Sequence, residues 1–286
     1  MPELPEVETV ARGLQRTVAG RRILRVTLGK TDFIDNPEEV ERELPGKLIR
    51  VVERYGKFML LRLRPSHGMK EESRESALLV HLGMTGMLAP AASDAPHQKH
   101  THVLMPLDDG RELRYVDPRR FGRIAYLTAE KLQAELLRFG VDPLEVSRDE
   151  FVRRICARKS RIKALLLDQG VLRGVGNIYA DESLWRSKIH PAQLGTKLKP
   201  AQVQKLYTAL QAILHRAILM HGSSISNFLD AEGQPGEYQQ HHRAYGREGK
   251  GCYRCKTPIR RIIVAGRSSY LCPSCQKTPR ARKKKR

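Results

Sequence analysis

The first ten residues, MPELPEVETV, combine a proline in second position with carboxylates at Glu3 and Glu6. Removal of Met1, which a small second residue favours, leaves Pro2 with a free secondary amine. An N-terminal amine has a reference pKa of about 8, so an unprotonated, nucleophilic fraction exists near neutral pH. The adjacent carboxylates are of the type that transfers protons. The alternative is purely structural, because Pro5 suits the first turn of a helix and acidic residues stabilise a helix N-terminus.

Four cysteines near the C-terminus, Cys252, Cys255, Cys272 and Cys275, form a C-x2-C-x16-C-x2-C array. Two close pairs separated by enough chain for a β-hairpin can converge on a tetrahedral thiolate site. Four thiolates leave a zinc ion no open position, so the predicted zinc is structural rather than catalytic. Two redox pairs or two disulfides are the competing interpretations. The fifth cysteine, Cys156, is expected to be a free thiol on a half-buried helix face.

The stretch LRGVGNIYADE places two glycines directly before a predicted helix that starts near Asn177. Backbone N–H groups at such a helix start can bind a phosphate, and glycine lets the phosphate approach closely. A plain glycine turn between two helices is the alternative. The preceding ARKSRIKALLLD adds Lys159, Arg161 and Lys163, and together the two stretches predict a clamp on a DNA backbone.

The stretch YVDPRRFGRI joins Arg119 to Phe121, a pair that can enter a duplex and fill the gap left by an extruded nucleotide. An ordinary turn with solvated arginines is the alternative. Met84 is either a core residue or a third filler, and His81 is either a buried strand histidine or a phosphate donor. Lys57, among alternating apolar residues, either faces solvent on a strand or points into a basic cleft.

Charge favours a polyanionic partner. The chain has 52 Lys and Arg against 31 Asp and Glu, a net charge of +21 and a pI near 10.1. The terminal KTPRARKKKR carries seven of these charges, so 21 − 7 = +14 remain without it. Phosphate neutralisation with counterion release therefore points to nucleic acid. No apolar run reaches the ~20 residues that span a membrane, and the N-terminus lacks the layout of a secretion signal, which predicts a cytoplasmic protein.

The order of local patterns predicts an α+β protein. After a helix that ends near Gly20, residues 21–127 are rich in strand signals and favour an antiparallel sandwich or barrel-like domain. From Thr128 the apolar period is helical. The segment HGSSISNFLDAEGQPG is too polar and too interrupted for a core element, which indicates a loop or lid. The expected division is 1–127 (β domain), 128–239 (helical domain), 240–277 (zinc ribbon) and 278–286 (basic tail).

In order and across nearly the whole chain, the motifs PELPEVETV, YGKFMLL, HLGMTG, DPRRFG and GVGNIYADE and the four-cysteine ribbon resemble the bacterial formamidopyrimidine-DNA glycosylases. These bifunctional repair enzymes remove 8-oxoguanine and ring-opened purines. The resemblance implies an N-terminal β-sandwich, a helix-two-turns-helix domain and a zinc ribbon, with damaged duplex DNA held by a monomer between the domains. Two features depart from the family pattern, a long PSHGMKEESRES loop and the basic tail.

The resemblance also implies roles for residues. Pro2 would attack C1′ of the damaged nucleotide and form a Schiff base, with Glu3 as the acid-base group and Glu6 organising the N-terminus. β- and δ-elimination would follow, and one structural Zn²⁺ would be the only cofactor. Four residues would bind the phosphates flanking the lesion: Lys57, His81, Asn177 and Arg267. Two of them, Lys57 and Arg267, are also counted as catalytic residues. The space that the extruded nucleotide leaves in the base stack would be filled by Met84, Arg119 and Phe121. The pocket for the damaged base would contain Lys159.

Two other functions stay open from the sequence. Endonuclease-VIII-like enzymes, which prefer oxidised pyrimidines, share the architecture. They typically have glycine at the position of Leu4 and lack the GVGNIY sequence motif. A non-catalytic zinc-ribbon protein that binds nucleic acid would have the same charge and cysteines but no need for Pro2 and Glu3. A nucleoid-associated, bacterial location is the expectation for either repair enzyme.

Overall fold

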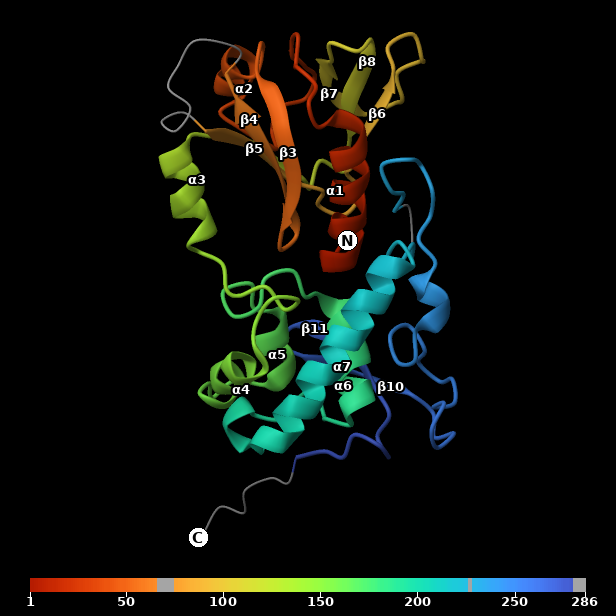
Figure 1. The fold of residues 1–286 in the computed structure, drawn as a ribbon. Coiled ribbons are helices and arrows are strands. Elements are labelled where there is room, and N and C mark those ends of the chain that lie inside the picture. The colour runs from red at the N-terminus through yellow and green to blue at the C-terminus, as the bar shows by residue number, and fades with distance from the viewer. Residues whose placement is uncertain (66–74, 226–227, 280–286) are drawn as a thin grey trace. The chain divides into compact units, whose positions relative to one another are not determined.

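The computed structural model describes residues 1–65, 75–225 and 228–279 (Figure 1). Most of the predicted loop PSHGMKEESRES and of the basic tail lies outside these residues. The chain folds into two compact units. Unit 1 comprises Met1–Arg138 and Ile218–Gln239, and unit 2 comprises Phe139–Ala217 and Gln240–Arg286. Among the described residues, no helix has the length and apolar character needed to cross a membrane.

Unit 1 begins with α1 (Leu4–Val18), the helix that the first motif predicts. Glu3 is its N-cap and Pro5 lies in its first turn, where a missing N–H costs nothing. Its apolar stripe is buried in a core that also takes side chains from both sheets of the unit. α1 contacts β3 (Leu48–Tyr55) of one sheet and β6 (Met87–Ala92) of the other, so it packs where the two sheets meet.

Two sheets make unit 1 a β-sandwich, as predicted. The four-stranded sheet has the order β1-β7-β8-β6 and the five-stranded sheet the order β2-β9-β5-β4-β3. Only the short β2–β9 pairing is parallel. The strands of the first sheet are β1 (Thr27–Leu28), β6 (Met87–Ala92), β7 (Thr101–Pro106) and β8 (Arg111–Val116). Those of the second are β2 (Ile34–Asp35), β3 (Leu48–Tyr55), β4 (Phe58–Arg64), β5 (Ser76–His81) and β9 (Arg123–Leu127). Two helices, α2 (Pro37–Glu43) and α3 (Ala129–Leu136), complete the unit.

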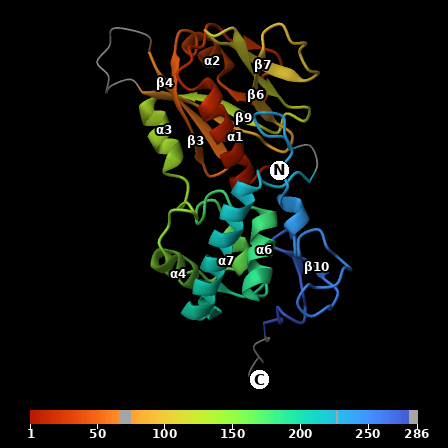
Figure 2. The ribbon, with the colours of Figure 1, turned by 45° about the vertical axis from the view of Figure 1, so that its right-hand side comes forward.

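Unit 2 is helical apart from its last segment, and Figure 2 shows α4, α6 and α7 from a second side. The helices are α4 (Arg148–Cys156), α5 (Ile162–Leu167), α6 (Asn177–Ser187) and α7 (Pro200–Leu219), with a short 3-10 turn at Gly195–Lys197. A second 3-10 turn, Tyr238–His241, begins in unit 1 and ends in unit 2. Ser147 caps α4 by accepting the N–H of Glu150, as the capping-box pattern predicts. α7 continues into unit 1 at its last two residues.

A β-hairpin ends unit 2. Strands β10 (Arg260–Val264) and β11 (Arg267–Leu271) pair antiparallel, with Val264 opposite Arg267. The two residues between them, Ala265 and Gly266, have φ angles of 51° and 72°. Positive φ at both central positions is characteristic of a type I′ two-residue hairpin turn, so the strand-turn-strand prediction is confirmed.

Candidate active site and metal centre

The N-terminus is held by two buried carboxylates of α1. Glu3 is 3% exposed and Glu6 is 1% exposed. The Glu6 Oε2 accepts the backbone N–H of Glu3 at 2.8 Å, which fixes the chain directly behind Pro2. Pro2 is buried, and Met1 before it is 51% exposed. While Met1 is attached, the nitrogen of Pro2 is a tertiary amide without nucleophilic character.

The other oxygen of Glu6 reaches a distant part of unit 1. Its Oε1 accepts the backbone N–H of Ser223 at 2.7 Å. The preceding Gly222 has a φ of +79°, and a Cβ there would lie 2.7 Å from the same Oε1. One carboxylate therefore joins the N-terminus to the start of HGSSISNFLDAEGQPG, a connection that sequence reasoning did not predict. The described residues of that segment form no helix or strand.

Lys57 and His81 lie close together at one end of the five-stranded sheet. Lys57 is not the solvent-facing strand residue considered above, because it is buried in the two-residue turn between β3 and β4, after Gly56. The His81 ring lies 4.9 Å from that of Phe58, and Phe58 pairs with His81 across β4 and β5. Burial, aided by the charges of Lys57 and Arg123, lowers the pKa of His81 to about 4.

The tautomer of His81 follows from its neighbour. Its Nδ1 accepts the backbone N–H of Gly83 at 3.1 Å, so the proton of the neutral ring is on Nε2. His81 is therefore a neutral donor at physiological pH, a form that binds an anion by hydrogen bonding rather than by charge.

Met84, Arg119 and Phe121 belong to two loops in direct contact. A Cβ on Gly83 would lie 2.4 Å from the carbonyl of Phe121, so the loops touch at their backbones. Met84 is 42% and Phe121 55% exposed, unusual for side chains of this size. The Arg119 guanidinium lies over the Phe121 ring at 4.5 Å. These three side chains form an exposed apolar and cationic group that we call the wedge.

The remaining arginines of YVDPRRFGRI do not belong to the wedge. Arg120 pairs with Asp32 at 2.7 and 2.8 Å, and Arg123 pairs with both Asp35 and Glu135. Arg119, by contrast, makes no ion pair within the part of the chain that the structure describes. Its guanidinium lies on the Phe121 ring instead.

Asp117 holds the wedge loop in place. It is fully buried and accepts hydrogen bonds from Thr85 Oγ1 at 2.6 Å and from the backbone N–H groups of Arg119 and Gly122. Tyr115 donates to it as well. Asp117 therefore connects the loop that bears Met84 with the loop that bears Phe121. In the sequence, the Asp-Pro pair of DPRRFG is the local pattern that marks this turn.

Asn177 begins α6, with Gly176 as N-cap. Gly174 has a φ of +98°, a conformation that glycine adopts readily, so the glycine-rich turn is needed to start the helix. The Oδ1 of Asn177 is buried and has no hydrogen-bond partner among residues 1–65, 75–225 and 228–279. The Nδ2 amide of a side chain at a helix N-terminus can donate a hydrogen bond to an anion.

The predicted backbone clamp is wrong for one of its three cations. Lys163 is 0% exposed, and its Nζ donates to Asp181 Oδ1 and to the carbonyl of Ser268, both at 2.7 Å. It therefore has no access to DNA, because its position on α5 faces α6 and β11 rather than solvent. Lys159 and Arg161 are exposed, and Lys159 lies in the connection between α4 and α5.

Two acidic residues of α6 were also missed by sequence reasoning. Asp181 Oδ2 accepts the N–H of Tyr270 on β11 at 2.9 Å. Glu182 accepts the backbone N–H groups of Arg243, Ala244 and Tyr245 at 2.8–3.0 Å. The two acidic residues of the GVGNIYADE motif thus attach the ribbon and the segment before it to α6. Arg267 is exposed at the hairpin tip, beside the anchored Ser268.

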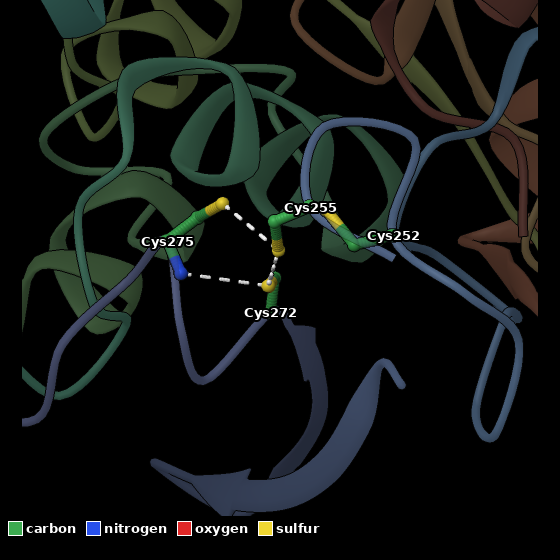
Figure 3. Close-up of side chains that lie close together, drawn as sticks. All are labelled: Cys252, Cys255, Cys272 and Cys275. Carbon is green, nitrogen blue, oxygen red and sulfur yellow. Dashed lines mark hydrogen bonds between the residues drawn. The ribbon is translucent and has the colours of Figure 1, made fainter. Parts of the chain in front are cut away.

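The four cysteines converge, as Figure 3 shows. Their sulfur atoms all lie within 4.8 Å of one another, with Cys255 Sγ 3.4 Å from that of Cys272 and 3.6 Å from that of Cys275. Four sulfurs at about 2.3 Å from a tetrahedral zinc are about 3.8 Å apart, so the donor set fits the ion. Cys252, Cys255, Cys272 and Cys275 form a site for one structural zinc ion. Cys156 is half-buried and distant in sequence.

Comparison with known proteins agrees with this arrangement. Family models match three stretches: the formamidopyrimidine-DNA glycosylase N-terminal domain over residues 1–124, its H2TH domain over 139–229, and a zinc finger found in FPG and IleRS over 249–278. The formamidopyrimidine-DNA glycosylase of Herpetosiphon aurantiacus is 42% identical, covering 96% of this chain and 100% of the relative. That of Solibacter usitatus is 44% identical, covering 97% and 100%.

Solved structures are similar as well. The Lactococcus lactis enzyme in complex with a Fapy-dG-containing DNA has a TM-score of 0.86 at 32% identity, covering 96% of this chain and 100% of that chain. The same enzyme with abasic-site DNA has a TM-score of 0.87 at 32% identity, with the same coverage. With the α+β fold, the four-cysteine site and relatives matched end to end, the chain belongs to the formamidopyrimidine-DNA glycosylase family.

Proposed function

We propose that this protein is a bifunctional glycosylase and AP lyase that excises oxidised purines, 8-oxoguanine and formamidopyrimidines, from duplex DNA. The observation that carries the proposal is the N-terminus, where buried Glu3 follows Pro2 directly and is held by Glu6. A chain that only bound DNA would have no need to bury two carboxylates there. The complexes of the L. lactis relative with Fapy-dG and abasic-site DNA support the same substrate class.

The proposed chemistry starts with loss of Met1. The freed amine of Pro2 attacks C1′ of the damaged nucleotide, the C1′–N bond breaks, and the base leaves with a proton. Glu3 protonates the sugar-ring oxygen as the ring opens to the Schiff base. The iminium makes the C2′ hydrogen acidic, so its removal expels the 3′ phosphate, and a second elimination expels the 5′ phosphate. The product is a one-nucleotide gap with phosphates at both ends.

We infer that two groups in each unit bind DNA phosphates. In unit 1 these are the Lys57 ammonium and the Nε2–H of His81, and in unit 2 the Asn177 helix start and the Arg267 guanidinium. Extruding a base requires its flanking phosphates to be fixed. The wedge of Met84, Arg119 and Phe121 fills the vacated position, with Arg119 facing the orphaned base. Exposed Lys159 is proposed for the damaged-base pocket.

The organisation proposed with this function has four parts, 1–127, 128–239, 240–277 and 278–286. The matches of the three family models support its first three parts, whereas in the structure residues 128–138 and 218–239 belong to unit 1 and not to the helical unit. We propose that the enzyme acts as a monomer in the bacterial cytoplasm, associated with the nucleoid.

Borohydride trapping tests the nucleophile. The full chain, with its N-terminus confirmed as Pro2, is incubated with a duplex carrying 8-oxoguanine opposite cytosine, and the reduced adduct is mapped by mass spectrometry. We expect one adduct on Pro2. Pro2→Gly and Glu3→Gln should abolish strand cleavage while leaving DNA binding largely intact.

The matched control is Glu8→Gln, because Glu8 is a carboxylate of the same helix that pairs with Arg12 and Arg54 instead of the N-terminus. It should cleave normally. Unchanged cleavage by Glu3→Gln would remove the proposed acid-base role. Trapping with an oxidised-pyrimidine duplex but not with 8-oxoguanine would identify an endonuclease-VIII-like enzyme, and trapping with neither would indicate a binding protein.

A further inference from the structure

The chain has a single tryptophan, and it lies against the metal centre. Trp185 is in the last turn of α6 and is 8% exposed. Its indole Nε1–H donates a hydrogen bond to Sγ of Cys252 at 3.4 Å. Cys252 is therefore a buried ligand whose sulfur accepts a hydrogen bond from a donor outside the ribbon.

Arg254, between the first two cysteines, holds the same tryptophan from its other side. Its guanidinium lies over the Trp185 ring at 4.0 Å. It also donates to the carbonyls of Trp185 and Arg186 at 2.7 and 2.8 Å. These carbonyls belong to the helix end, where backbone acceptors lack partners within the helix and a cation is favourable. The positive charge over the ring face polarises the indole N–H and makes it a better donor.

Water is excluded from this bond. Trp185 and Cys252 pack with Ala244, Ile259 and Cys272 in one buried apolar cluster. A hydrogen bond to an ionised acceptor is stronger than a neutral one, and low local polarity strengthens it further. Groups that donate to metal ligands tune metal affinity, and their loss typically costs 10–100-fold.

We propose that Trp185 is a positioning residue of the zinc site, whose indole N–H stabilises the Cys252 thiolate and slows the loss of zinc. The bond requires no change in coordination, since the indole contacts the ligand and not the ion. Because α6 also begins with Asn177, metal loss should weaken DNA binding through this helix, a consequence that rests on the proposed function.

The test uses the zinc-loaded full chain and needs no DNA, so its result is independent of the proposed function. Trp185→Phe removes the N–H and keeps an aromatic ring, and 3-benzothienylalanine at position 185 keeps the bicyclic shape with sulfur in place of the N–H. Tyr270→Phe is the matched control, because Tyr270 packs on the same cluster without contacting a cysteine sulfur through its hydroxyl. Zinc transfer to a chromophoric chelator is followed for each protein.

We expect both replacements at position 185 to release zinc about tenfold faster than the wild type and the Tyr270→Phe protein. In the cobalt-substituted proteins, the sulfur-to-cobalt charge-transfer band should move to lower energy in both, because a thiolate without the hydrogen bond is more easily oxidised. If the benzothienyl protein keeps the wild-type rate and band, packing rather than the N–H is responsible and the proposal is wrong. Wild-type behaviour of both replacements would also overturn it.

Discussion

Single buried carboxylates connect segments of this protein that are far apart in sequence. Glu6 accepts N–H groups from Glu3 and Ser223, and Asp117 accepts the distant Thr85 hydroxyl as well as the N–H groups of its own loop. A buried carboxylate is stable only when such donors satisfy it. Each of these carboxylates therefore fixes the positions of the groups that donate to it, and those donors in turn fix the carboxylate.

Gly222 and Gly233 offer a comparison of two glycines with nearly the same backbone. Their φ angles are +79° and +78°, but a Cβ on Gly222 would meet the Glu6 carboxylate, whereas one on Gly233 would meet nothing within 4 Å. Gly233→Ala should lower the free energy of unfolding by about 1 kcal/mol, the cost of a left-handed alanine. Gly222→Ala should cost about 1–3 kcal/mol more, because Glu6 must leave its donors.

Urea unfolding of the two alanine variants measures this difference. Strand cleavage should fall for Gly222→Ala and stay near the wild-type level for Gly233→Ala. Equal losses of stability would show that the Glu6 contact with this segment contributes nothing.

His81 predicts a specific dependence of stability on pH. Its pKa is about 4 in the folded protein and 6.5 in the unfolded chain. Above pH 6.5 both states are neutral, so the stability contribution is complete. As the pH falls towards 4, only the unfolded state takes up a proton, and stability is lost. Between pH 7 and 5 this amounts to about 2 kcal/mol.

Urea unfolding at both pH values, for the wild type and for His81→Gln, isolates this effect from other histidines. The wild type should lose about 2 kcal/mol more than the variant on going to pH 5. The same loss in both proteins would mean that His81 is protonated in the folded state.

At the scale of elements, α5, α6 and β11 are joined through one buried ion pair. Lys163 on α5 and Asp181 on α6 each also bond to the backbone of β11. Burial raises the pKa of the Asp181 carboxyl, and the Lys163 ammonium opposes that rise. The elements that bear Asn177 and Arg267 are thus fixed by the same two side chains within unit 2.

Lys163→Met should destabilise unit 2 by about 3–5 kcal/mol, since it leaves Asp181 without its counter-ion in the interior. The control, Arg148→Met, breaks an exposed pair with Asp149 on α4 and should cost less than about 1 kcal/mol. Thermal or urea unfolding monitored by hydrogen exchange of unit 2 amides gives both values. A cost below 1 kcal/mol for Lys163→Met would show that the pair is not needed for stability.

At the scale of the whole molecule, the net charge of +21 should make DNA binding fall steeply with salt. The two proposed phosphate contacts of unit 2 differ in charge, which separates their effects. Arg267→Gln should reduce the slope of log K against log salt by about one. Asn177→Ala should weaken binding with an unchanged slope, because the asparagine is neutral.

Fluorescence anisotropy with a lesion duplex at several salt concentrations measures both slopes. An unchanged slope for Arg267→Gln would remove that guanidinium from the phosphate contacts. A reduced slope for Asn177→Ala would mean that its loss disturbs charged neighbours as well.

Much of the fold follows from local signals. The Glu3-to-Glu6 helix start and the positive-φ turn at Ala265 and Gly266 are properties of a few consecutive residues, and the four cysteines lie within one short stretch, 252–275. Local backbone preference and apolar period act over this range, so the helices, hairpins and zinc ribbon are readable in the sequence. The order of motifs likewise indicated the family and its candidate site residues.

Only the tertiary structure decided which charged residues are available. Lys159 and Lys163 are four residues apart in one basic stretch, yet one is exposed and the other is buried against Asp181. Arg119 and Arg120 are adjacent, yet only Arg120 has a carboxylate partner among the described residues. The partners Asp32 and Asp181 come from distant segments, and no local pattern specifies which segment will supply a counter-ion. The sequence thus determined the chemistry present, and long-range packing determined which groups remain free to perform it.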